Sequence, residues 1–340
     1  MNRPLLTIVV PCYNEEEVLP ETCRQLRGVL HDLVGEQLAA PASKLLFVDD
    51  GSKDGTWSMI TAEHANHPEV TGLKLARNVG HQKALLAGLE AACAHSDCVV
   101  SIDADLQDDI RSIRDFILKF HEGFDVVYGV RACRQSDTWF KRTSALAFYG
   151  LMTRIGIQLI PNHADFRLMS KRAVRELCRY GETNVFLRGI VPLVGFSATQ
   201  VFYDRKERLA GRSKYGIRKM LSFAFDGIAS FSVAPIRFVT SLGLALLAMS
   251  IVAGGYALFQ KWAGETNAGW TSLIVSVWFL GALQLLGIGI IGEYMGKIFV
   301  EVKRRPKYAV EIDLYSPASE SAARNRRHYS LTKRHSVLIK

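Results

Sequence analysis

The chain has 340 residues, 49% of them apolar and 22% charged, a composition that allows one large domain with a sizeable core plus an appendage. Its formal net charge is +9. The sequence contains neither zinc-finger spacing nor an RNP-like motif, so we expect no nucleic-acid partner. Its six cysteines show no CxxC pair and no metal-ligand spacing, so we expect buried thiols rather than disulfides or zinc ligands.

The first half of the chain alternates apolar runs with amphipathic stretches. Pro11 and an acidic triplet end the first run, which is too short for a signal peptide and is typical of a buried strand. We predict strands at residues 5–10, 44–48, 70–75, 98–102 and 125–130, and helices at 15–33, 54–63, 81–92 and 109–121. This alternation predicts an α/β fold, a mostly parallel, Rossmann-like sheet with helices on both faces. Such sheets bind ligands beyond the carboxyl ends of their strands.

The middle of the chain is less regular. Residues 138–158 are amphipathic and rich in aromatic side chains, and they fit either a helix lying at a membrane surface or a helix packed on the core. Residues 198–203 are predicted to form another strand. Residues 205–219 are basic and contain glycine, which indicates a loop that enters a helix.

Two uncharged runs follow, at residues 238–260 and 271–292. At about 1.5 Å of rise per residue, each is long enough as a helix to cross an apolar layer of roughly 30 Å. Because the connection between them is short, we predict an antiparallel transmembrane hairpin. Basic residues lie on both outer flanks, which predicts cytoplasmic ends and attraction to anionic lipid headgroups: Arg218, Lys219, Arg237, Lys297, Lys303, Arg304, Arg305 and Lys307.

Two acidic motifs stand at predicted strand ends. Asp103 and Asp105 follow the strand at 98–102, and Gln107 adds a neutral oxygen, a set of hard ligands that suits Mg²⁺ or Mn²⁺ with substrate phosphates completing the shell. Asp49 and Asp50 follow the strand at 44–48. Either motif alone would fit a solvated turn or a helix cap. Together they favour a nucleoside and metal site at one edge of the sheet.

Several motifs in order resemble family 2 glycosyltransferases of the GT-A fold, and more narrowly the branch of dolichol-phosphate mannose synthase and the bactoprenol glucosyltransferases. The resemblance covers nearly everything except the C-terminal tail. It is carried by Pro11-Cys12-Tyr13-Asn14-Glu15, the DDGSKDGT stretch from Asp49, Arg77-Asn78-Val79-Gly80-His81, Asp103-Ala104-Asp105-Leu106-Gln107, Asp165-Phe166-Arg167-Leu168-Met169, Arg205-Lys206-Glu207-Arg208, Gly211-Arg212-Ser213-Lys214-Tyr215 and Gly292-Glu293-Tyr294.

The resemblance implies an inverting transfer of a sugar from a nucleotide-sugar to a polyprenyl phosphate such as undecaprenyl phosphate; it favours a UDP-sugar and leaves a GDP-sugar open. It implies a nucleotide-sugar site formed by Pro11, Glu15, Asp49, Asp50 and Asp103. It implies a Mg²⁺ or Mn²⁺ site formed by Asp103, Asp105 and Gln107. It also implies phosphate contacts by Arg131, Arg205, Arg208 and Lys214, and a catalytic set of Asp165, Arg205 and Arg208.

The chemistry of a phosphate acceptor qualifies the role of Asp165. A phosphate monoester, with a second pKa of about 6, is largely dianionic near neutral pH and already nucleophilic. The reaction therefore needs neutralisation of charge on the acceptor and the leaving diphosphate more than it needs a general base. We expect Asp165 to position a sugar hydroxyl or an arginine more than to take a proton. We expect His81 and Trp139 to be structural.

The resulting division of the chain is a cytoplasmic GT-A catalytic domain at 1–212, a juxtamembrane amphipathic region at 213–236, two transmembrane helices within 237–292 and a cytoplasmic basic tail at 293–340, disordered from 316. We expect an integral inner-membrane protein. Glycines in the apolar runs permit a homo-oligomer packed through the membrane: Gly243, Gly254, Gly255, Gly281, Gly287, Gly289 and Gly292. The alternatives are a membrane-anchored, non-catalytic GT-A scaffold or regulatory subunit and a processive polysaccharide synthase. The chain lacks the QxxRW motif and the further spans of such a synthase. The transferred sugar is not readable from the motifs.

Overall fold

The computed structural model describes residues 3–132, 163–183, 185–204, 241–245 and 269–316, with a few further positions between 236 and 262. These residues belong to two compact units, one containing the sheet with its helices and the other containing the long helix α10. The amphipathic stretch 138–158, the basic loop 205–219 and the tail beyond 316 lie outside the described residues.

The first unit is built on an eight-stranded sheet with the order β7-β5-β6-β4-β1-β2-β3-β8. The pairs β4-β1, β1-β2, β2-β3 and β5-β7 are parallel, while β6 and β8 run antiparallel to their neighbours. The predicted mostly parallel sheet is therefore confirmed. Its strands are β1 (Leu6–Cys12), β2 (Lys44–Asp49), β3 (Val70–Leu75), β4 (Cys98–Ser101), β5 (Val126–Arg131), β6 (His163–Ser170), β7 (Ala198–Tyr203) and β8 (Val310–Asp313).

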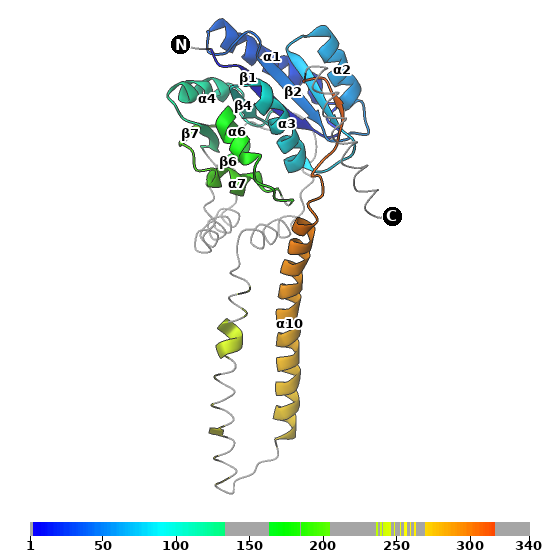
Figure 1. Cartoon of the computed structure of the whole chain (residues 1–340), viewed down its shortest axis with the longest axis vertical. Coiled ribbons are helices and arrows are strands. Elements are labelled where there is room, and N and C mark those ends of the chain that lie inside the picture. The colour runs from blue at the N-terminus through cyan, green and yellow to red at the C-terminus, as the bar shows by residue number, and fades with distance from the viewer. Residues whose placement is uncertain are drawn as a thin grey trace. The chain divides into compact units, whose positions relative to one another are not determined.

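Helices cover both faces of this sheet (Figure 1). Alternate residues of β1, such as Leu6 and Ile8, join a core with α1 and α4. Val9 points the other way and meets α3 so closely that a Cβ on Gly88 would lie 2.4 Å from its Cγ1. The helices are α1 (Leu19–Gly35), α2 (Thr56–Asn66), α3 (His81–His95), α4 (Ser112–His121), α6 (Lys171–Leu177) and α7 (Leu187–Leu193).

Strand β8 lies in a segment for which the sequence predicts no strand. It comes after α10, in the segment taken as a tail, and pairs antiparallel with β3. The Tyr315 hydroxyl lies 2.9 Å from Thr7 Oγ1 and 3.1 Å from Ser96 Oγ, which fastens the segment to the sheet unit. The edge of β3 is thereby covered, and an uncovered edge would be open to pairing with other chains.

The second unit contains α10 (Trp270–Val302), 33 residues long. Within it, Phe279–Val302 is a 24-residue stretch with a mean hydropathy of 1.4, long and apolar enough to cross a membrane. The predicted second span, 271–292, lies inside α10. The predicted first span, 238–260, falls mostly outside the described residues, so the hairpin stays a prediction.

Candidate active site

The ends of β1 and β2 form one side of the site. Their register places Cys12 beside Asp49, and the backbone N–H of Asp50 donates to the carbonyl of Cys12 over 2.9 Å. The following loops are joined by a hydrogen bond from the backbone N–H of Glu15 to Thr56 Oγ1 at 2.9 Å. Pro11 is buried within β1. Four of the five residues predicted to form the nucleotide-sugar site, all but Asp103, therefore lie on two adjacent strand ends or in the loops that follow them.

The two carboxylates at the end of β2 have different surroundings. Asp50 accepts one hydrogen bond on each carboxylate oxygen, from the backbone N–H of Val79 at 2.7 Å and from that of Gly80 at 2.9 Å. These bonds fix the loop that precedes α3. Asp49 accepts from the backbone N–H of Ser52 with Oδ1, while its buried Oδ2 accepts no hydrogen bond. Burial raises the pKa of both carboxyls. Of the two, Asp49 has an oxygen that can still accept a hydrogen bond.

The antiparallel pairing of β6 with β4 brings two further carboxylates together. Ser101 pairs with Arg167, so the residues two positions beyond, Asp103 and Asp165, face each other across the strand ends. The Ser101 hydroxyl donates to the carbonyl of Asp165 at 2.5 Å. His81, at the start of α3, has Nε2 3.4 Å from Asp103 Oδ1 and 3.5 Å from Asp165 Oδ2. Its ring therefore lies between the two acids.

Asp165 is buried and surrounded by donors. Arg167 Nη2 donates to Oδ1 over 2.6 Å and Gln82 Nε2 to Oδ2 over 2.9 Å. Arg188 donates from Nε and Nη2, each over 3.3 Å. Burial alone would raise the pKa of Asp165, but the hydrogen bond from His81 and the charges of the two arginines outweigh it and hold that pKa well below its usual range. Such a carboxylate is a weak base.

The motif after β4 has the donor set of a divalent-cation site. Asp103 Oδ1 is buried and accepts no hydrogen bond. Burial raises the pKa of Asp103 to about 6; the charge of His81 opposes this rise and the neighbouring carboxylates add to it. The ionised form of Asp103 is therefore disfavoured, and a bound cation would stabilise it. Asp105 Oδ1 accepts from the backbone N–H of Gln107 at 3.3 Å, which closes the turn. Among the described residues no three His, Cys, Asp or Glu side chains form a metal cage, so a cation here would need other oxygens such as those of Gln107 and phosphate.

A second buried aspartate holds an arginine beside this motif. Asp108 Oδ1 accepts from Arg131 Nη2 at 3.1 Å and from the Tyr203 hydroxyl at 2.6 Å. Burial would lower the pKa of Arg131, but the carboxylate of Asp108 raises it, so the guanidinium stays charged. Arg131 lies at the end of β5 with 28% of its side chain exposed.

The model of glycosyl transferase family 2 matches residues 7–178. The chain belongs to this family. YkoT of Bacillus subtilis, described as an uncharacterized glycosyltransferase, is 66% identical over 93% of this chain and 94% of its own. The SfII prophage-derived bactoprenol glucosyl transferase of Shigella flexneri is 40% identical over 90% of this chain and 97% of its own. A solved structure, the mannosyltransferase PcManGT of Pyrobaculum calidifontis, covers 87% of this chain and 88% of its own at 17% identity and a TM-score of 0.45.

In the structure of this glycosyltransferase, the predicted residues Asp103 and Asp165 lie together, while most of the predicted basic residues are not described. Arg205, Arg208 and Lys214 lie outside the described residues. Gln82, Asp108 and Arg188 were missed. Gln82 directly follows the motif that ends at His81, and Asp108 directly follows the motif that ends at Gln107, so both could have been found from these motifs. No motif or spacing in the sequence marks the segment around Arg188. His81, expected to be structural, contacts both Asp103 and Asp165.

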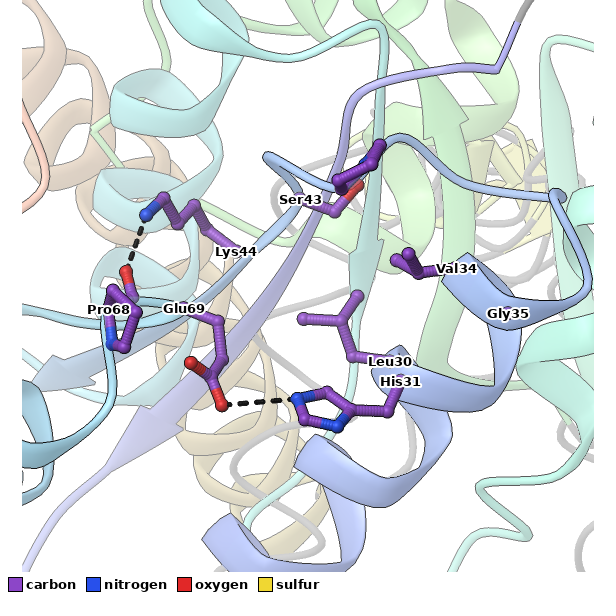
Figure 2. A pocket seen from close by; sticks show the side chains of 9 residues that line it. Leu30, His31, Val34, Gly35, Ser43, Lys44, Pro68 and Glu69 are labelled. Carbon is purple, nitrogen blue, oxygen red and sulfur yellow. Dashed lines mark hydrogen bonds and ion pairs between the residues drawn. The ribbon is translucent and has the colours of Figure 1, made fainter.

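A pocket also lies at the opposite end of the strands (Figure 2). It is bounded by the end of α1 and the starts of β2 and β3, where His31 Nε2 lies 3.4 Å from Glu69 Oε1 and Lys44 Nζ donates to the carbonyl of Pro68 at 2.5 Å. The acidic residues stand at the carboxyl ends of β1, β2 and β4 instead. Because parallel sheets bind substrates at that end, we place the active site there and not in this pocket.

Proposed function

We propose that this glycosyltransferase moves a sugar from a nucleotide-sugar, a UDP-sugar first, to a polyprenyl phosphate such as undecaprenyl phosphate, with inversion at the anomeric carbon. The proposal is carried by two acids that meet at His81, Asp103 and the buried Asp165, and by two partly exposed arginines, Arg188 held at Asp165 and Arg131 held at Asp108. Carboxylates suit a cation-bound diphosphate, and arginines suit phosphate oxygens. The 40% identity to a bactoprenol glucosyl transferase along nearly its whole length supports the choice of acceptor.

The donor would occupy the side formed by β1 and β2. The unoccupied Asp49 Oδ2 would accept from the base or ribose, with Pro11 and Glu15 as neighbours, while Asp50 would act indirectly by holding the loop at Val79. Asp103, Asp105 and Gln107 would hold Mg²⁺ or Mn²⁺. When bound, this cation would offset the charge of the leaving diphosphate.

The acceptor phosphate would need no proton removed before attack. The weak basicity of Asp165 is consistent with that chemistry, because a carboxylate already saturated by arginine, histidine and glutamine donors is suited to fixing their positions. A single displacement by the phosphate oxygen inverts the anomeric centre without a covalent enzyme intermediate. Arg205, Arg208 and Lys214 remain proposed phosphate contacts.

The location of the acceptor gives a reason for the apolar helix. A polyprenyl phosphate resides in the membrane, and α10, whose 33 residues contain the predicted span 271–292, is long enough to anchor the enzyme beside it. We propose an integral membrane protein in which 1–212 and 293–340 face the cytoplasm, 213–236 lies along the membrane and 237–292 spans it twice. We also propose a homo-oligomer that associates through these spans.

The decisive experiment is a transfer assay with the purified full-length protein. Radiolabelled UDP- and GDP-sugars are offered with undecaprenyl phosphate and Mg²⁺ or Mn²⁺, beside EDTA and Asp105→Ala controls. We expect one donor to give a labelled lipid that is absent from both controls. Undiminished product in EDTA would refute the metal assignment, and no product from any donor would refute the proposed acceptor or donor class.

A further inference from the structure

Two arginines beside the acidic motif share one arrangement. Arg188 is held by the buried Asp165, and Arg131 by the buried Asp108, each through Nε and Nη2. Yet 42% of the Arg188 side chain and 28% of that of Arg131 are exposed. Each guanidinium is therefore fixed on one edge and open on the other.

Arg131 and Arg188 lie on neighbouring elements of the sheet unit. The pKa of Arg188 is raised, because the Asp165 carboxylate more than offsets the lowering effect of burial. The charge of Arg131 is among the influences that lower the pKa of Arg188. Both arginines come from adjacent parts of the sheet unit, since β5 pairs with β6 and α7 packs on β6. Like charges placed near each other at a site are disfavoured until an anion arrives.

Arg188 is not required to neutralise Asp165. Arg167, only 2% exposed, already donates to that carboxylate over 2.6 Å, and Gln82 and His81 contact its other oxygen. Gln82 also accepts from the backbone N–H of Leu187 at 3.1 Å, which fixes the start of α7 relative to Asp165. The start of α7, which carries Arg188, is thereby held beside Asp165.

We infer that Arg188 binds a phosphate group of a substrate together with Arg131, and that Asp165 and Asp108 are the positioning residues of this pair. A planar guanidinium held along one edge presents its remaining N–H groups in a fixed direction, which suits the oxygens of a phosphate. The inference rests on the proposed function, which supplies two phosphate-bearing ligands, the donor diphosphate and the carrier phosphate.

The test compares Arg188→Gln with Arg172→Gln in the full-length protein. Arg172 is a matched control, because its exposed guanidinium also bonds the buried Asp125 through Nε and Nη2, both at 2.5 Å, but at the far end of β6. Binding of UDP with Mn²⁺ and binding of undecaprenyl phosphate are measured separately by calorimetry, with undecaprenol as the lipid that lacks the phosphate. Thermal melting shows that each variant is folded.

We expect Arg188→Gln to weaken the binding of at least one of the two phosphate ligands by about 10- to 100-fold, the usual effect of losing a hydrogen bond to a charged group. We expect Arg172→Gln to leave the affinities for both ligands unchanged. Loss of UDP binding would assign the pair to the donor, and loss of undecaprenyl phosphate binding would assign it to the carrier. Unchanged binding of both by a folded Arg188→Gln protein would overturn the inference.

If Arg188→Gln fails to fold, Arg188→Lys keeps the charge and replaces the fork by a single ammonium. Weaker binding of either phosphate ligand by Arg188→Lys would support the inference, and wild-type affinity for both would overturn it. These binding measurements need no turnover. A wild-type enzyme that transfers nothing, but whose phosphate binding depends on Arg188, would therefore refute the proposed reaction and leave the arginine pair standing.

Discussion

Removing the charge of Asp165 should cost this enzyme much of its stability. In Asp165→Asn the carbon framework is unchanged, but the guanidinium of Arg167, 2% exposed, loses the carboxylate that lies 2.6 Å from its Nη2. Removing one partner of a buried ion pair costs about 3–5 kcal/mol, because the other charge stays buried and unpaired. For a domain of this size the melting temperature should fall by about 6–20 °C.

The assay is thermal unfolding of the full-length protein in detergent, followed by intrinsic fluorescence. The double variant Asp165→Asn/Arg167→Met is the control, since replacing both members of a buried pair by neutral groups of similar size is often close to neutral. We expect the double variant to melt well above Asp165→Asn. We expect neither to regain sugar transfer, because Arg188 loses its positioning carboxylate in both.

Two results would refute this reasoning. A loss below about 1 kcal/mol in Asp165→Asn would mean that the Arg167 charge reaches water or another acid in the native protein. A double variant no more stable than the single one would mean that the carboxylate acts through its other partners, Gln82 and Arg188, and not through Arg167.

Three further predictions concern separate parts of the sheet unit. Asp49→Asn should weaken UDP binding by about 10-fold or more in calorimetry, because its free oxygen is the proposed nucleoside contact; unaltered binding would contradict that role. Burial would raise the pKa of Asp125, but its hydrogen bonds outweigh burial and lower this pKa in the folded protein. The carboxylate therefore stabilises the fold fully above its unfolded pKa of about 3.9, and this stabilisation is lost as the pH falls through its folded pKa. Melting curves of Asp125→Asn should accordingly depend less on pH below about 4 than those of the wild type. Gly88→Ala should destabilise the fold by about 1–3 kcal/mol, because the added Cβ would lie 2.4 Å from a methyl carbon of Val9. At the helical Gly28, which has nothing within 4 Å, the same change should stabilise by about 0.5–1 kcal/mol, and equal effects at the two glycines in chemical denaturation would contradict the packing described.

The local hydrophobic pattern of the sequence predicts the helices and strands of the first 130 residues. The predicted strand at 44–48 appears as Lys44–Asp49 and the predicted strand at 70–75 as Val70–Leu75. The helix predicted at 15–33 begins later, at Leu19, because residues 13–18 form the loop that is joined to Ser52 and Thr56. Buried parallel strands are continuous apolar runs, so their sequence alone marks them.

The sequence by itself also determined that acidic side chains end β2 and β4, since a strand and the residues after it are a local property. What only the tertiary structure decided is which distant groups meet them. The pairing of Ser101 with Arg167 places Asp165 opposite Asp103, and the packing of α7 on β6 brings in Arg188. Strand β8 reaches β3 from more than 200 residues away in the chain. Such pairings depend on the register between strands and on the surfaces that distant segments bury against each other. The hydrophobic periodicity of a single segment predicts neither of these.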